Sequence, residues 1–233
     1  MSVWYCIPSA KPARDAQDCI NEWRRMGYKV AVWRDADAQP VEADFAIYAP
    51  YPGYAQAVNT LAHTVLEMDP GCQWVVTGGD DVFPDQNKHP EQIARECSRR
   101  FGKGDIASHG DAEDLFGTYG IMQPIGDAWG GIERICGSPW MGREWCERAN
   151  KGAGPLHPDY WHCFVDEFLQ EAAKVQGCFW QRKDLKHEHR HWQREKRPMP
   201  SYLAKANSQA HWDEFKALFN RHRATGFAES YPA

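Results

Sequence analysis

Trp74-Val-Val-Thr-Gly-Gly-Asp-Asp81 is the stretch from which the rest of this 233-residue sequence is best understood. Its first four residues are typical of a buried parallel strand, because they form a short apolar run that ends at glycines. Ligands of open α/β sheets bind at the carboxyl ends of strands, where Asp80 and Asp81 are expected to lie. Adjacent carboxylates repel each other, and the usual reason for such a pair is a hard divalent cation. The alternative is an Asp-rich turn, since aspartate and glycine both favour turns.

Strands and helices alternate along the chain on both sides of this stretch. The spacing of apolar residues predicts strands at 3–7, 28–33, 44–48, 120–123 and 178–180, and helices at 14–27, 54–68, 89–101, 143–150 and 160–175. This order predicts an α/β fold with a mostly parallel, nucleotide-binding type of sheet flanked by helices. No Gly-x-Gly-x-x-Gly follows the first strand and no P-loop motif occurs, so neither a dinucleotide cofactor nor a P-loop is expected.

Length and composition favour one main domain with a C-terminal arm. Residues 1–197 are predicted to form the main domain, and residues 198–233 a helical extension packed on it, with a helix at 204–223. The net charge of −5 argues against a protein that coats nucleic acid through overall positive charge. Eleven tryptophans are many for this length, and tryptophan also serves as a stacking surface for sugars and bases.

Cysteine usage and hydropathy predict the compartment. The eight cysteines are scattered without a Cys-x-x-Cys pair, which is typical of a reducing compartment and not of a zinc ribbon or a disulfide framework. The first residues lack the basic region and long apolar run of a signal peptide. No apolar stretch approaches the roughly 20 residues of a membrane span. The sequence therefore predicts a cytoplasmic protein with no membrane partner.

Two further groups of chemically active side chains come late in the sequence. Asp166 and Glu167 lie near the start of a predicted helix, where a carboxylate either stabilises the helix dipole or serves as a general base. His187, His189 and His191 alternate along an extended segment, so their side chains would share one side. Either of the first two is expected to join the carboxylate pair as a metal ligand. A solvated basic strand and a His₃ zinc centre are the alternatives.

These groups suit transfer of a group from a nucleoside diphosphate to a hydroxyl. A divalent cation between the phosphates and the protein carboxylates neutralises the charge of the leaving group. A carboxylate on the other side takes the proton of the incoming hydroxyl. Further positive charge for the phosphates is available from the basic side chains Arg182, Lys183, Lys186 and Arg190.

The order of these motifs resembles the GT-A glycosyltransferases, and it is most similar to the inverting family-two enzymes and their bacteriophage relatives. The resemblance covers residues 3–192 and depends on the order and spacing of short motifs. The matched motifs are the first strand and nucleotide loop Cys6-Ile-Pro-Ser-Ala10, the helix Gly53-Tyr-Ala-Gln-Ala-Val-Asn59, the metal motif Gly79-Asp-Asp81 and the acidic motif Val165-Asp-Glu167. The metal motif lacks the family's intervening residue, and His189-Arg-His-Trp192 stands where the family has Gln-x-x-Arg-Trp.

The resemblance implies a role for each matched position. Asp166, with Glu167 beside it, would be the catalytic base of an inverting reaction. Mn²⁺ or Mg²⁺ would be bound by Asp81 and Asp80 with His189 or His187. The donor, a UDP-sugar, would contact Pro8, Ser9, Ala10, Arg14, Asp35, Asn59, Gly79 and Asp80.

Two acceptor classes follow from the resemblance. Some compact phage-encoded relatives glycosylate hydroxymethylated bases in DNA, so a base turned out of the duplex, in the host cytoplasm, is one expected acceptor. The basic run 182–197 suits a phosphate backbone. A saccharide or another small molecule is the other acceptor class. Two other functions share the same features: a sugar nucleotidyltransferase, and a non-catalytic module that binds sugar or nucleic acid through its tryptophans.

Overall fold

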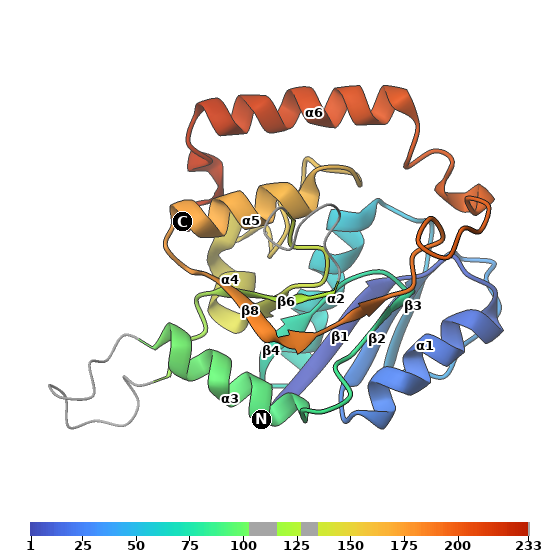
Figure 1. The fold of residues 1–233 in the computed structure, drawn as a ribbon, viewed down its shortest axis with the longest axis horizontal. Helices are drawn as coiled ribbons and strands as arrows, with labels where there is room; N and C mark the ends of the chain where they lie inside the picture. Colours follow the sequence, from blue (N-terminus) through green and yellow to red (C-terminus); the bar gives the residue numbers. More distant parts are fainter. Residues whose placement is uncertain (103–115, 127–134, 233) are drawn as a thin grey trace, which may run out of the picture.

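The computed structural model describes residues 1–102, 116–126 and 135–232, in which one mixed seven-stranded sheet forms the middle layer (Figure 1). The order of strands across this sheet is β3-β2-β1-β4-β7-β6-β8. The strands are β1 (Ser2–Pro8), β2 (Lys29–Arg34), β3 (Phe45–Tyr48), β4 (Cys72–Val76), β6 (Ile121–Ile125), β7 (Trp140–Gly142) and β8 (Phe179–Lys186). A separate two-stranded ribbon pairs β5 (Val82–Phe83) with β9 (Glu188–His189).

Most neighbouring strands of the large sheet run parallel. β1 pairs in parallel with β2 and β4, β2 with β3, and β6 with β8. β7 runs antiparallel to both of its neighbours, β4 and β6. The predicted α/β class with a mostly parallel sheet is therefore confirmed. The sequence did not reveal β7, because three residues are too few to show a strand pattern.

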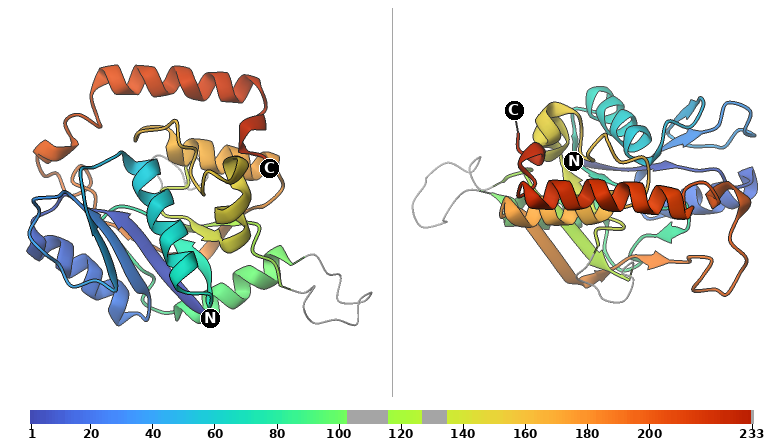
Figure 2. Two further views of the ribbon diagram at one scale, coloured as in Figure 1. Left: turned by 180° about the vertical axis from the view of Figure 1, so that it is seen from behind. Right: turned by 90° about the horizontal axis from the view of Figure 1, so that it is seen from above.

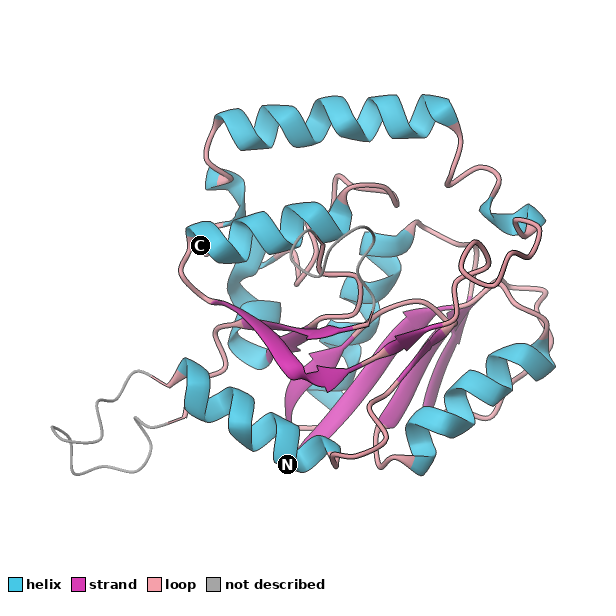
Figure 3. Ribbon diagram, viewed as in Figure 1, coloured by secondary structure: helices cyan, strands magenta, loops and turns pink. Residues whose placement is uncertain are grey.

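Helices cover both faces of the sheet (Figure 3). They are α1 (Ala13–Arg25), α2 (Tyr54–Met68), α3 (Pro90–Phe101), α4 (Arg143–Arg148), α5 (Val165–Val175) and α6 (Gln209–Ala224). Apolar residues of α2, α4, α5 and α6 share one buried core with one face of the sheet. Residues of α1 and α3 share a second core with the other face, in which Trp23, Trp74 and Trp140 are fully buried. The apolar spacing that predicted these helices is thus explained by a sheet that needs cover on both sides.

Several elements differ in length from their sequence predictions; the C-terminal helix, for example, begins at Gln209 and not at residue 204. The helix predicted to begin at residue 160 begins at Val165, because Phe164 has a left-handed backbone with φ of 65°. Few non-glycine residues adopt this conformation, and no apolar spacing reveals it. The strand predicted to end at residue 180 continues as β8 to Lys186. The late start of α5 places Asp166 and Glu167 in its first turn.

The C-terminal arm crosses the molecule on the same side as α5 (Figure 2). It contains two 3₁₀ turns, η3 (Ser201–Leu203) and η4 (Ala228–Ser230), on either side of α6. Ser208 caps α6, since its Oγ accepts a hydrogen bond of 3.4 Å from the His211 N–H. Phe215 and Phe219 of α6 are buried in the core that also contains α5. Of the helices in the described residues, none combines the length and the apolar character needed to cross a membrane.

Candidate active site

A cavity of about 1520 Å³ opens at the carboxyl ends of β1, β2 and β4, and part of its wall comes from the C-terminal arm. Parallel strands end at one edge of a sheet, which is why loops far apart in the sequence meet here. The cavity is lined by three groups that the sequence had singled out: Asp80 with Asp81, His189 with His191, and Asp166 with Glu167.

Asp80 is held by the loop that follows β1. Its Oδ2 accepts a hydrogen bond of 2.6 Å from Ser9 Oγ, and Lys11 Nζ lies 3.3 Å from its Oδ1. Lys11 Nζ also donates to the Asp80 carbonyl at 2.8 Å. Burial raises the pKa of Asp80, with the charge of Asp81 acting in the same direction and Lys11 opposing it. The first loop and the acidic pair therefore form one connected unit.

Asp81 faces His189 across the β5–β9 ribbon. Val82 is paired with His189 in this ribbon, and the Arg190 N–H donates to the Asp81 carbonyl at 2.8 Å. His189 Nε2 consequently lies 3.2 Å from Asp81 Oδ1. Burial alone would raise the pKa of Asp81, but the hydrogen bond and charge of His189, aided by Lys11, outweigh burial and lower it below its ordinary value.

Gly79 leaves room for the Asp81 carboxylate. A Cβ at this position would come nearer than 3.0 Å to Asp81 Oδ1. Tyr5 fixes the turn from the other side, because its hydroxyl donates to the Gly79 carbonyl at 2.6 Å. Glycine at 79 is therefore needed for the direction of the carboxylate that meets His189.

Of the residues predicted to bind metal, Asp81 and His189 are the pair whose ligand atoms lie together in the cavity. Carboxylate oxygen and imidazole nitrogen are both ligands of first-row divalent metals, and both side chains line the cavity. Asp80 adds negative charge beside them, although its carboxylate already contacts Ser9 and Lys11.

His187, the other histidine predicted as a metal ligand, has a different environment. It is fully buried, its Nδ1 lies 3.0 Å from Ser138 Oγ, and its ring meets the edge of Trp23. It is not among the described residues that line the cavity. In one regular strand, residues 187 and 189 would point to the same side. His187 instead lies between β8 and β9, so the strand is interrupted there. His189 meets the acidic pair, whereas His187 lies in the core.

The residues predicted to bind the donor fall into two groups. Those that line the cavity are Pro8, Ser9, Ala10, Asp35, Gly79 and Asp80. Arg14 is not among the described lining residues, whereas Asp15 is. Asn59 is buried and holds the loop before α5, since its Nδ2 donates to the Leu156 carbonyl at 2.8 Å and its Oδ1 accepts from the Leu156 N–H at 2.9 Å.

Aromatic side chains that the sequence analysis did not assign lie beside Asp35, one of the residues predicted to contact the donor. Trp33 and Tyr51 line the cavity together with Asp35. The charge of Asp35 is among the causes that raise the pKa of Tyr51, after burial and Tyr54, so this ring and carboxylate are neighbours. Rings of this kind are suitable stacking surfaces for a nucleobase.

Glu167, next to Asp166 in the first turn of α5, has a strongly perturbed environment. Burial and the neighbouring Asp166 carboxylate raise the pKa of Glu167 well above its ordinary value. Glu167 Oε2 is buried and has no hydrogen-bond partner within the described part of the chain. The raised pKa favours the protonated form of Glu167 near neutral pH.

Rings of the C-terminal arm hold the start of α5. The Phe164 ring lies 4.6 Å from that of Trp212 and 5.7 Å from that of Phe219, both on α6. These contacts offset the cost of the left-handed backbone at Phe164, which is of order 1–3 kcal/mol for such a residue. The arm thereby fixes the position from which Asp166 enters the cavity.

Three further aromatic side chains form part of the cavity wall, and the sequence had pointed to them only through the number of tryptophans. Trp161, Trp212 and Tyr202 line the cavity, and the latter two are 44% and 40% exposed. Lys205 Nζ lies 4.5 Å from the Trp161 ring centre. Composition cannot distinguish a tryptophan of this wall from a core residue such as Trp74, because only tertiary structure separates the two.

Comparison with known proteins gives similar folds at low similarity. No protein-family profile and no curated protein matches the chain. One similar structure is a glycosyltransferase involved in the glycosylation of the major capsid of PBCV-1, with 13% identity, coverage of 63% of this chain and 62% of that chain, and a TM-score of 0.36. Another is a mutant Drosophila β-1,4-galactosyltransferase 7 in complex with manganese, UDP-Gal and xylobiose, with 9% identity, coverage of 89% and 80%, and a TM-score of 0.45. The chain thus spans less than two thirds of the first structure, and at these scores neither likeness assigns an activity.

Proposed function

We propose that this protein is a metal-dependent glycosyltransferase of the GT-A type, which moves a sugar from a nucleotide-sugar, most simply a UDP-sugar, to a hydroxyl acceptor. One observation carries the proposal. A single cavity contains the loop after β1, the Asp81–His189 pair and the protonated Glu167 beside Asp166. A donor site, a cation site and a base for the acceptor are the three parts that this reaction needs.

On the donor side, Asp81 and His189 would hold Mn²⁺ or Mg²⁺, with Asp80 adding charge. A bound divalent cation would neutralise the diphosphate leaving group. Lys11 and Ser9 keep Asp80 in place through their contacts with its carboxylate.

On the acceptor side, Asp166 would take the proton of the attacking hydroxyl. Glu167 holds its own proton and so leaves Asp166 as the accepting carboxylate. If Asp166 deprotonates the acceptor, the hydroxyl can attack the donor sugar directly and no protein nucleophile is required. Such a single displacement supports the inverting outcome.

A saccharide is the acceptor that the cavity favours over DNA. Trp161, Trp212 and Tyr202 offer flat surfaces for sugar rings. Some side chains of the basic run 182–197, which suggested a DNA acceptor, already form ion pairs within the protein. Arg182 is 3% exposed and pairs with Glu96 and Asp184.

Arg190 in the same run lies 3.1 Å from Glu188 and stacks on the Phe83 ring at 4.0 Å. These contacts reduce the positive charge that the run offers to a phosphate backbone. A hydroxymethylated base of phage DNA remains the second proposed acceptor, because Arg197 and Lys205 also line the cavity.

A reducing compartment is part of the same proposal. All eight cysteines are buried, and no disulfide joins any two of them in the part of the chain that the structure describes. This supports a cytoplasmic protein, the host cytoplasm if the chain is encoded by a phage.

The function is tested with a panel of nucleotide-sugars, each with Mn²⁺ and with EDTA. Thermal stabilisation and release of nucleoside diphosphate are measured, first without an acceptor and then with saccharides or modified DNA. The proposal expects Mn²⁺-dependent stabilisation by one nucleotide-sugar, by about 2.7 kcal/mol at 100-fold saturation. Release of nucleoside diphosphate should rise when the right acceptor is added. A nucleotidyltransferase would instead give nucleoside triphosphate from pyrophosphate, and a binding module would show binding without metal or turnover.

A further inference from the structure

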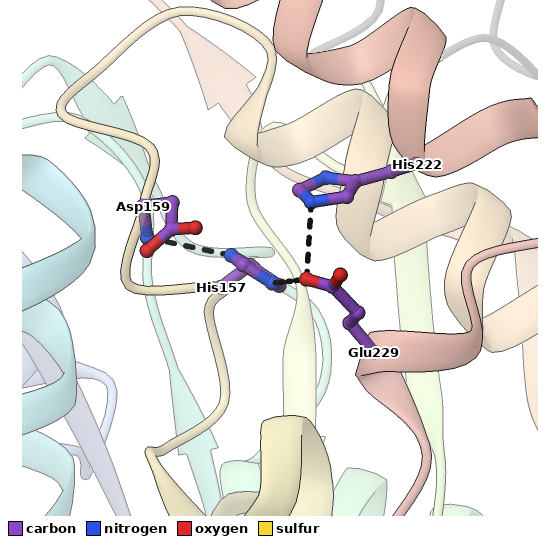
Figure 4. A group of neighbouring side chains, drawn as sticks. All are labelled: His157, Asp159, His222 and Glu229. Carbon is purple, nitrogen blue, oxygen red and sulfur yellow. Dashed lines mark hydrogen bonds and ion pairs between the residues drawn. The ribbon is translucent and has the colours of Figure 1, made fainter. Parts of the chain in front are cut away.

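Figure 4 shows a group of neighbouring side chains of the types that can ligate a metal ion. It consists of His157 and Asp159 in the loop before α5, His222 on α6 and Glu229 in η4. One ligand atom of each residue lies within 4.8 Å of those of the other three. None of the four is among the described residues that line the cavity, so the group is separate from the proposed cation site at Asp81.

The distances inside this group match a tetrahedral coordination shell. Nε2 of His222 lies 3.3 Å from Oε2 of Glu229, and Nε2 of His157 lies 3.5 Å from the same oxygen. Zinc–nitrogen and zinc–oxygen bonds of about 2.0–2.1 Å at tetrahedral angles place neighbouring ligand atoms about 3.3–3.4 Å apart. The two printed nitrogen–oxygen distances thus fit this spacing, and the two imidazole nitrogens lie within 4.8 Å of each other.

The surroundings fix the two imidazoles and leave the carboxylates accessible. Each histidine is 5% exposed, and the Phe168 ring packs against both, with ring centres 4.7 Å and 5.1 Å away. Nδ1 of His222 lies 2.9 Å from the Tyr160 hydroxyl, whose oxygen can accept a hydrogen bond from Nδ1–H while Nε2 binds a metal. Glu229 is exposed, and an ion can reach the two buried rings from its side.

We propose that His157, His222 and Glu229 bind one zinc-class cation, with Asp159 completing the group. Two imidazole nitrogens and a carboxylate form a donor set that suits Zn²⁺ better than Mn²⁺ or Mg²⁺, which prefer oxygen. As it stands, the Asp159 N–H donates to His157 Nδ1 at 3.3 Å. Metal on Nε2 requires the other tautomer, in which Nδ1–H is directed to the Asp159 carboxylate. No proton is gained or lost by the ring in this exchange.

The cation would fasten the C-terminal arm to the loop that leads into α5. Two of its ligands, His222 and Glu229, come from the arm, and the third, His157, comes from the loop, where Asp159 stands beside it. The same arm supplies the rings that hold Phe164 in front of Asp166. The site is therefore structural, and its existence does not depend on the activity proposed above.

The proposal is tested on the full chain prepared without a histidine tag. The protein is treated with a chelator, exposed to Zn²⁺, desalted, and its metal content is measured. Glu229→Gln removes one ligand at an exposed position, and Glu214→Gln is the control, an exposed carboxylate on α6. Asp81→Asn is measured in parallel to separate any cation bound in the cavity.

We expect one tightly held Zn²⁺ per chain in the wild type, in Glu214→Gln and in Asp81→Asn. In Glu229→Gln the affinity should fall at least about tenfold. Co²⁺ in place of Zn²⁺ should give the strong visible absorption of a tetrahedral site, lost in Glu229→Gln, and Zn²⁺ should raise the melting temperature of the wild type. The proposal is overturned if the wild type retains no Zn²⁺, or if Glu229→Gln binds Zn²⁺ as tightly as Glu214→Gln does. His222→Gln provides the second ligand variant, with the same two readouts.

Discussion

His189 Nε2 lies 3.2 Å from Asp81 Oδ1, although the two residues come from opposite halves of the chain. The two-stranded ribbon brings them together, since Val82 of β5 pairs with His189 of β9. Without a cation, the imidazole stabilises the Asp81 carboxylate and lowers its pKa against the effect of burial. The same two atoms are those that a divalent cation in the cavity would use, so the contact is the natural place to test the proposed site.

Asp81→Asn is expected to weaken Mn²⁺-dependent binding of UDP at least about tenfold, because it removes the charged ligand from the cation site. Calorimetric titration of UDP in Mn²⁺ and in EDTA measures the effect. Asp37→Asn, at an exposed turn after β2, is the matched control and should bind UDP as the wild type does. Equal affinity of Asp81→Asn and Asp37→Asn in Mn²⁺ would contradict the assignment of Asp81.

Gly79→Ala is expected to impair the cation site while leaving the protein folded. The added Cβ would come nearer than 3.0 Å to Asp81 Oδ1, the far end of a side chain that can turn away. The melting temperature without ligand should stay close to that of the wild type, and the Mn²⁺-dependent rise with UDP should shrink. A variant with an unchanged response to UDP would show that the direction of the Asp81 carboxylate does not matter.

Gly53→Ala is expected to lower the free energy of unfolding by about 2 kcal/mol more than Gly177→Ala. Both glycines have positive φ, of 104° and 69°, so both variants carry backbone strain. Only at Gly53 does a Cβ meet a neighbour, at 2.5 Å from Trp161 Cδ1, while nothing lies within 4 Å at Gly177. Gly53 also has ψ of 161°, a combination open essentially to glycine alone, so the larger loss combines this contact with greater backbone strain. Denaturant unfolding of the two variants measures the difference, and equal losses would contradict the prediction.

Asp69→Asn should lower the free energy of unfolding near neutral pH by about 1 kcal/mol. The expected loss is no larger because Lys29, one of the partners of Asp69, is partly exposed and solvent screens its charge. Asp69 Oδ2 accepts hydrogen bonds from Ser2 Oγ, Trp4 Nε1 and Lys29 Nζ at 2.7, 2.9 and 2.8 Å. Burial opposes these contacts, yet together they lower the pKa of Asp69.

A lowered folded-state pKa gives stability that is present above the unfolded-state value, near 4, and is lost as the pH falls below it. The difference between the wild type and Asp69→Asn should therefore shrink in unfolding titrations taken from pH 7 to pH 3. Glu67→Gln, an exposed change on the same helix α2, should show no such trend.

The sequence predicted the central sheet because its strands and helices carry strong local patterns. The apolar run before Gly78 predicts a buried strand, and the apolar spacing in α1, α2 and α3 predicts helices that cover the sheet. It missed β5, β7 and β9, which are two or three residues long and depend on partners supplied by the fold. Because β5 and β9 set the Asp81–His189 contact, no local pattern could separate His189 from His187.

The first turn of α5 likewise shows what the sequence could not predict. Asp166 and Glu167 were recognisable as a pair, but the raised pKa of Glu167 depends on burial that the sequence does not contain. The left-handed backbone at Phe164 depends on Trp212 and Phe219, far along the chain. His157, His222 and Glu229 went unnoticed for a related reason, since only the return of the arm brings them together.

Asp166→Asn and Glu167→Gln are expected to separate the two acids of α5. If Asp166 is the base, Asp166→Asn keeps nucleotide-sugar binding and lowers the rate of transfer by about 10²- to 10⁴-fold, the usual contribution of general-base catalysis. Glu167→Gln replaces a carboxyl that is already protonated near neutral pH, so its rate of transfer should fall far less.

Stability separates the two variants as well. The pKa of Glu167 is higher in the folded state than in the unfolded state. The free energy of unfolding is therefore highest below the unfolded-state pKa and decreases as the pH rises above it. Glu167→Gln should therefore gain stability relative to the wild type between pH 5 and pH 9 in unfolding titrations, a range that lies above that ordinary value of about 4.3. A wild-type rate of transfer in Asp166→Asn would instead exclude Asp166 as the base, and a large loss of rate in Glu167→Gln alone would assign that role to Glu167.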